Sequence, residues 1–182
     1  MKLSVLLFLF TSLSFAQMRN YEMMKKDLLN DVIRQETFNN KGETFIAKKI
    51  DSVNVEHLLK LILEKPYITN PDFQSENLIL TGEELEYLSK AIRQQYKNEW
   101  QEKDFNNRKL LQKSDILEYL NKDLTSQVLM ISKPIYIKSD NTAFIYIASL
   151  HRHKGYGNSS LALYTNKDGI WKKSFNIIED NY

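Results

Sequence analysis

Residues 160–178 read SLALYTNKDGIWKKSFNII, and this stretch decides the fold of the second half of the chain. Its centre, Asn166-Lys167-Asp168-Gly169, is typical of a hairpin turn, because Asp-Gly accepts the positive backbone angles of a tight loop. Apolar and aromatic residues flank the turn on both sides. The pattern therefore predicts two antiparallel strands, over residues 160–165 and 170–178.

Two further strands are expected before this hairpin, because the apolar pattern changes from a helical period to a period of two near Gln127. Residues 128–137 predict a strand that Pro134 interrupts, so this strand lies at an edge or carries a bulge. Residues 143–150 are strongly apolar and predict a central strand. The C-terminal third is thus expected to form a four-stranded antiparallel meander.

Amphipathic helices are expected to precede this sheet. A stripe of Tyr21, Met24, Leu28 and Val32 predicts a helix over residues 18–38. Residues 39–42 end it, with Gly42 suited to a left-handed cap. A short strand is expected over residues 43–50.

Two more helices and a shorter third one follow in the pattern. Residues 55–63 carry apolar side chains at helical spacing, with Asn54 as the expected cap and Pro66 as the stop. Thr81 and Glu84 form a capping box. The apolar stripe that follows it comprises Leu85, Leu88, Ile92, Tyr96 and Trp100. Ser114-Asp115 opens the shorter helix. We therefore expect one α+β domain over residues 17–182, with N-terminal amphipathic helices packed on one face of the C-terminal four-stranded antiparallel meander.

The first residues, MKLSVLLFLFTSLSFAQ, have the layout of a secretory signal peptide. Lys2 supplies the positive start, residues 3–10 form the apolar segment, and Ser14 and Ala16 are the small residues before a cleavage site. The apolar run is too short for a stable membrane anchor. We expect residues 1–16 to be removed after Ala16, and the protein to be periplasmic or secreted, with no stable membrane insertion after cleavage.

Composition narrows the classes of function. A net charge of +2, with both signs interspersed, gives no electrostatic argument for a nucleic-acid partner. The chain has no cysteine, which excludes a thiol nucleophile, a cysteine-ligated zinc ion and an iron–sulfur cluster. The sequence also has no nucleophile elbow, no metalloprotease motif, no Walker loop and no dinucleotide fingerprint. No cofactor and no metal site is therefore assigned.

The most unusual stretch is residues 151–158, HRHKGYGN, which follows the expected central strand. His151 and His153 would point to the same side if the strand persists, but a zinc site needs further ligands. Arg152 and Lys154 supply positive charge, and the two glycines let backbone amides approach an anion. A solvated hairpin loop explains the same residues. The candidate ligand-binding residues are His151, Arg152, His153, Lys154 and Tyr156.

Other candidates have plainer structural explanations. His57 lies opposite the apolar stripe of its helix and is expected to be exposed. The capping box accounts for Glu84, and the positive end of a helix accounts for Glu83 and Glu86 in the first turn. Trp171 is expected in the core. A cluster of tyrosines at 136, 146, 156 and 164 would suit recognition of a ligand or protein if it were exposed.

Three segments resemble a group of uncharacterised exported proteins of Bacteroidetes-type bacteria. These are residues 80–88, residues 100–111, and a sheet pattern S-K-P-I-F/Y … D-G-x-W-K, present here at 132–136 and 168–172. The resemblance covers roughly residues 80–175 and implies an exported α+β protein without supplying catalytic residues. Members of the group often have a Cys/Gly-rich turn where this chain has residues 151–158.

Composition, motifs and resemblance lead to two hypotheses about function. The first is a non-enzymatic binding or interaction module that recognises an unknown protein or a small anionic ligand. The alternative is a small hydrolase or acid–base enzyme with its site near the 151–158 loop and the open face of the sheet. A histidine joined to a buried carboxylate would favour the enzyme, and an exposed recognition surface would favour the binding module.

Overall fold

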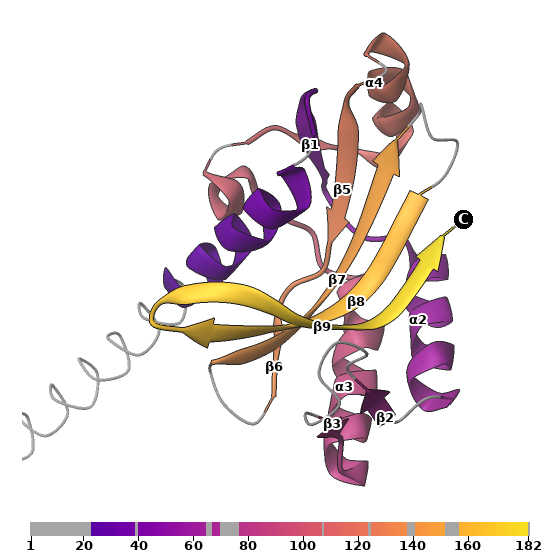
Figure 1. Ribbon diagram of the computed structural model, residues 1–182. Coiled ribbons are helices and arrows are strands. Elements are labelled where there is room, and N and C mark those ends of the chain that lie inside the picture. Colours follow the sequence, from indigo (N-terminus) through magenta and orange to yellow (C-terminus); the bar gives the residue numbers. More distant parts are fainter. Residues whose placement is uncertain are drawn as a thin grey trace, which may run out of the picture.

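The computed structural model describes residues 23–38, 40–64, 67–69, 77–106, 108–123, 125–137, 141–151 and 157–181. The expected signal peptide and residues 152–156 lie outside these ranges. Figure 1 shows helices on both sides of a twisted sheet.

The main sheet has seven strands in the order β4-β1-β5-β7-β8-β9, with β6 pairing to β7 off this path. Their bounds are β1 Thr44–Ala47, β4 Leu110–Leu111, β5 Gln127–Ile131, β6 Ile135–Tyr136, β7 Thr142–His151, β8 Gly157–Lys167 and β9 Ile170–Asn181. A separate antiparallel pair joins β2 Tyr67–Thr69 to β3 Asn77–Ile79.

The expected fold class is correct as α+β, but the expected sheet was wrong in size and direction. The meander β5-β7-β8-β9 is antiparallel throughout, as the pattern predicts. The strand β1, however, pairs in parallel with both β4 and β5, so the sheet is mixed. Pairing between strands so distant in the sequence leaves no local periodic signal, and β4 has only 2 residues.

The helices are not all N-terminal, which is a second correction. Residues 23–37 are helical. They are followed by α2 Ser52–Glu64, α3 Gly82–Gln95 and α4 Ile116–Lys122, with 3₁₀ turns η1 Glu102–Phe105 and η2 Lys113–Asp115. The strand β1 precedes α2 and α3, and β4 precedes α4, so helices and strands alternate in the first two thirds of the chain.

The helices cover both faces of the sheet rather than one. Helix 23–37 buries Leu28 and Val32 against residues of β5 and β7 such as Leu129 and Ile145. On the opposite face, α2, α3 and α4 pack against a second set that includes Phe144. Successive strand residues point to opposite faces, so β5 and β7 contribute to both clusters. This two-sided burial explains why β7 is almost continuously apolar.

The predicted turns and caps are largely confirmed. Asp168 and Gly169 have φ angles of 56° and 81°, as a tight hairpin loop requires. The Thr81 hydroxyl accepts the Glu84 N–H at 3.2 Å, and the Glu84 carboxylate accepts the Thr81 N–H at 2.9 Å. Two details were wrong. Helix α2 begins at Ser52, before the expected cap Asn54, and α3 ends at Gln95, so Trp100 lies beyond the helix.

The expected interruption at Pro134 is confirmed as a bulge. Ile131 pairs with Ile147 and Ile135 pairs with Phe144, so three residues oppose two across this gap. The Trp100 indole N–H donates to the Ile131 carbonyl at 2.7 Å. The Lys133 N–H donates to the Gln95 side chain at 2.9 Å. Gln95, the last residue of α3, and Trp100, which follows the helix, therefore satisfy backbone groups around the bulge.

Gly42 has a different role from the one expected. Gly42 does not have a positive φ angle, so it is not a left-handed cap. A Cβ at this position would instead lie 2.3 Å from the carbonyl carbon and oxygen of Thr125. Close approach of two backbones therefore requires the glycine.

Candidate functional site

A line of hydrogen-bonded polar side chains crosses the three strands β1, β5 and β7 near one end of the sheet. We call it the polar row and define it by Asn40, Thr44, Gln127, Ser149 and His151. The register places Thr44 opposite Gln127, and Gln127 opposite His151. Directly opposed residues share a face, and so do residues two apart on a strand. All four strand residues therefore point to the face that helix 23–37 covers elsewhere.

The contacts along the row form a continuous chain. The Asn40 amide donates to Thr44 Oγ1 at 3.2 Å, and the Gln127 amide donates to the same oxygen at 2.9 Å. Ser149 Oγ lies 3.5 Å from Gln127 Oε1 and 2.8 Å from His151 Nε2. A hydroxyl both donates and accepts, so Ser149 links the amide of Gln127 to the imidazole of His151.

Gln127 is the fixed point of the row. Only 2% of its surface is exposed, and a buried amide that keeps its partners holds a defined position. Thr44, Ser149 and His151 are half-buried, so they are within reach of solvent. The row therefore contains one buried residue with a defined position, Gln127, and three residues that solvent can reach.

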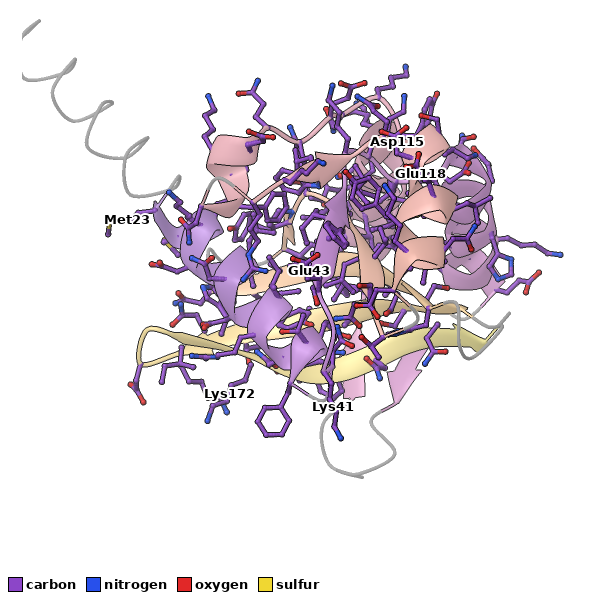
Figure 2. The ribbon with its side chains drawn as sticks, turned by 90° about the horizontal axis from the view of Figure 1, so that it is seen from above. Met23, Lys41, Glu43, Asp115, Glu118 and Lys172 are labelled. Carbon is purple, nitrogen blue, oxygen red and sulfur yellow. The ribbon has the colours of Figure 1, made fainter. Side chains whose placement is uncertain are left out.

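The turn before β5 anchors this end of the sheet. The Asp123 carboxylate accepts hydrogen bonds from the Thr125 N–H and the Ser126 hydroxyl, each at 2.9 Å. The hydrogen bonds from Thr125 and Ser126 hold the pKa of Asp123 below its ordinary value. The Glu43 carbonyl accepts the Gln127 N–H at 2.9 Å. Figure 2 views the molecule from above and shows Glu43 near the centre of this end.

The polar surface continues onto β8. Asn158 pairs with Ser149 and Ser160 pairs with Ile147, so both point to the same face as the row. Asn158 is exposed and Ser160 is half-buried. Further along the same face, Ala162 and Tyr164 pass under helix 23–37. The face is thus divided into an apolar part that the helix covers and a polar part at the end where β7 finishes (Figure 1).

The structure locates one of the five predicted site residues. His151 is the last residue of β7 and belongs to the row. Arg152, His153, Lys154 and Tyr156 lie outside the described residues. Among the residues that the structure describes, no group of three His, Asp or Glu side chains is arranged to hold a metal ion.

The plainer interpretations hold for several other candidates. His57 is exposed on α2. Glu84 forms the capping box. Trp171 is fully buried, with 0% of its surface exposed. Tyr146 and Tyr164 are also buried, so these two do not form an exposed recognition surface. Burial, together with the neighbouring Glu36 carboxylate, raises the pKa of Tyr164 and keeps its hydroxyl neutral.

Sequence reasoning missed Asn40, Thr44, Gln127 and Ser149. One signal for them was available, because Gln127 and Ser149 are polar residues at the ends of otherwise apolar strands. That signal does not show the register between the strands, and Asn40 and Thr44 join the row only because β1 pairs with β5.

Comparisons with known proteins give no relative from which a role could be transferred. No protein-family model matches the chain, and neither the curated proteins nor the solved structures compared with it gave a match. Within the described part of the chain, no helix has the length and apolar character needed to cross a bilayer.

Proposed function

We propose that the protein is an exported, non-enzymatic binding protein whose ligand or partner presents a negatively charged group to the polar row. The observation that carries this proposal is the division of one sheet face into a covered apolar part and an accessible polar part that includes His151. The signal-peptide layout of residues 1–16, and the resemblance to exported bacterial proteins, support a periplasmic or secreted location.

The chemistry of the row and its neighbourhood favours an anion. The exposed Asn158 amide offers hydrogen-bond donors, and an imidazole can add a positive charge near neutral pH. Arg152 and Lys154 lie one and three residues after His151 in the sequence, and both are cationic. Hydrogen bonds from such groups to an ionised acceptor are stronger than neutral ones. A carboxylate or phosphate group therefore suits the row better than a neutral or cationic ligand.

Calorimetric titration with inorganic phosphate and with citrate tests this proposal. We expect a saturable heat in the parent protein that weakens with added salt. The double variant Arg152→Ala/Lys154→Ala and the single variant His151→Ala should lose it. Lys90→Ala/Arg93→Ala and His57→Ala are matched controls, since these residues are exposed on α3 and α2. Equal binding by all variants, or no heat in the parent, would contradict an anion-binding row.

The proposed location is tested separately. Expression of the full chain in an export-competent bacterial host should release a mature protein that begins at Gln17. Mass spectrometry of the purified protein measures this directly. An intact Met1 on a cytoplasmic product would refute the export proposal.

One contact favours a second candidate function, a small hydrolase. Ser149 Oγ lies 2.8 Å from His151 Nε2, which is the reach of a nucleophile and its general base. Acyl transfer also needs N–H donors for the oxyanion. Strand β7 pairs with β5 on one side and β8 on the other, so sheet pairing engages its backbone amides around Ser149. The binding function is therefore the better supported.

A fluorophosphonate probe distinguishes the two candidates, because it labels activated serine hydroxyls covalently. The hydrolase hypothesis requires labelling at Ser149 that disappears in Ser149→Ala and in His151→Ala. We expect the parent and a matched Ser160→Ala control to show no labelling above that of Ser149→Ala.

A further inference from the structure

A cavity lies on the opposite face of the sheet from the polar row. It has a volume of about 240 Å³ and sits where β1 leads into α2, beside the end of α3 and the start of α4. Met130 of β5 forms part of its floor, so we call it the Met130 cavity. Met130 alternates with Leu129 on β5, and Leu129 belongs to the cluster under helix 23–37. The cavity and the row are therefore separated by the sheet.

The floor of the Met130 cavity is apolar. Ile50, Ile116 and Met130 line it, and all three are buried members of the core or adjoin it. A methionine side chain is unbranched and polarizable, so it adapts to the shape of a bound group. The floor thus suits a small hydrocarbon group rather than a second polar one.

The rim of the cavity is charged, and its balance is positive. Lys49, Lys113 and Asp51 contribute to the lining. The Lys113 ammonium pairs with the Asp51 carboxylate, which holds the lysine at the rim. The Lys49 ammonium lies 3.9 Å from Glu99 Oε1, at the outer limit of an ion pair, and its side chain is exposed. Tyr96, half-exposed at the end of α3, closes another side.

We propose that the Met130 cavity binds a small monocarboxylate with an apolar body. The apolar group rests on Ile50, Ile116 and Met130, and the carboxylate meets Lys49 and Lys113. Asp51 disfavours a ligand with two or more negative charges, because that ligand would be repelled at short range. The volume equals that of about eight water molecules at ~30 Å³ each, which suits a single ring or a short branched chain.

Methyl NMR on the mature protein tests this proposal at the floor itself. With ¹³C-methyl methionine, the Met130 methyl reports on the cavity, and Met23, exposed on the first helix, is an internal control. Benzoate should shift the Met130 signal saturably, because a bound ring lies against it. Benzyl alcohol, which has the same ring and no charge, should shift it far less at equal concentration. Inorganic phosphate should leave it unchanged.

Variants of the rim complete the test. Lys49→Ala should weaken benzoate binding about fivefold, the effect of losing one exposed charge pair. Lys113→Ala should weaken it more, because it also removes the ammonium that pairs with the Asp51 carboxylate beside the ligand. Lys90→Ala, on the exposed side of α3, should have no effect. Arg152→Ala/Lys154→Ala should also have none, which separates this site from the polar row.

Three outcomes would overturn the proposal. The first is a Met130 signal that does not move with benzoate. The second is an equal response to benzoate and benzyl alcohol, and the third is benzoate binding by the rim variants that matches the parent's. Both lysines are exposed, so their variants are expected to fold, and the salt dependence of the benzoate shift in the parent gives a further check.

Discussion

Asp31 on the first helix accepts a hydrogen bond from the backbone N–H of Trp171 at 2.9 Å. One turn later, the Gln35 amide donates to the Trp171 carbonyl at 2.9 Å, and its oxygen accepts the Lys173 N–H at 3.3 Å. Strand β9 is an edge of the sheet. The helix therefore satisfies outward-facing backbone groups that an edge strand would otherwise present to another chain.

Removal of this edge contact should affect both stability and association. Asp31→Ala leaves the Trp171 N–H without its acceptor, which we expect to cost about 1–3 kcal/mol in the free energy of unfolding. Urea denaturation measures this loss, and light scattering should show more self-association than in the parent. Asp27→Ala, exposed on the same helix, is the control and should change neither quantity. If Asp31→Ala has the same free energy of unfolding and the same self-association as the parent, the contact does not protect the edge strand β9.

Trp171 itself should be among the most costly residues to truncate. Its ring is fully buried and lies 6.3 Å from the Tyr136 ring, centroid to centroid. Trp171→Ala should destabilise the fold by about 3–5 kcal/mol, the usual cost of emptying a packed aromatic site. A denaturant midpoint near that of the parent would refute the core assignment.

The close approach of Gly42 and Thr125 predicts that alanine is destabilising at Gly42 but not at Gly82. Gly42→Ala would place a Cβ 2.3 Å from backbone atoms of Thr125, so we expect a loss of about 1–3 kcal/mol. Gly82→Ala begins a helix and meets nothing within 4 Å, so it should be neutral or slightly stabilising. Thermal or chemical unfolding of the two variants decides this. Equal effects at both positions would contradict the close approach.

Acid should weaken the attachment of the first helix to η1. Burial opposes ionisation of Asp104, but hydrogen bonds from the Gln101 N–H and the Lys25 ammonium, the latter at 3.1 Å, outweigh it and hold the pKa of Asp104 below its ordinary value. A lowered folded-state pKa adds stability above the unfolded pKa of about 3.9, and this stability is lost as pH falls through the folded value.

The Asp104 contribution is measured by unfolding at a series of pH values. Asp104→Asn should be less stable than the parent at pH 7, and the difference should shrink as pH falls below about 4, where the unfolded chain of the parent binds this proton before the folded one does. Glu102→Gln, on the exposed part of the same turn, is the control and should have the same stability as the parent at every pH. A constant difference at every pH would show that Asp104 acts by packing rather than by charge.

Local features of this fold could be predicted from the sequence because their causes are local. The capping box needs only Thr81 and Glu84, three residues apart, and the hairpin needs only Asp168 and Gly169. The burial of Trp171 was expected because a large aromatic side chain in a strand usually packs in the core. In each case, the chemistry that fixes the backbone lies within a few residues.

The parallel strands and most of the polar row could not be predicted, because their causes are not local. Strand β1 meets β5 across more than eighty residues of sequence, and that pairing brings Thr44 to Gln127. Gly42 was assigned to a cap because its partner, Thr125, is equally distant. His151 could be predicted as a site residue from the unusual composition of residues 151–158. Ser149 and Gln127 can be recognised as its neighbours only once the register of the strands is known.

Residue-specific NMR during a citrate titration tests the central claim most directly. Citrate carries several negative charges, so the Met130 cavity should exclude it and the polar row should bind it. We predict saturable shifts in the backbone amide signals of Ser149, His151 and Asn158, with no shift of the Met130 methyl and no response in Arg152→Ala/Lys154→Ala. Unchanged signals at these three residues, or shifts centred elsewhere, would contradict the assignment of the row as the binding site.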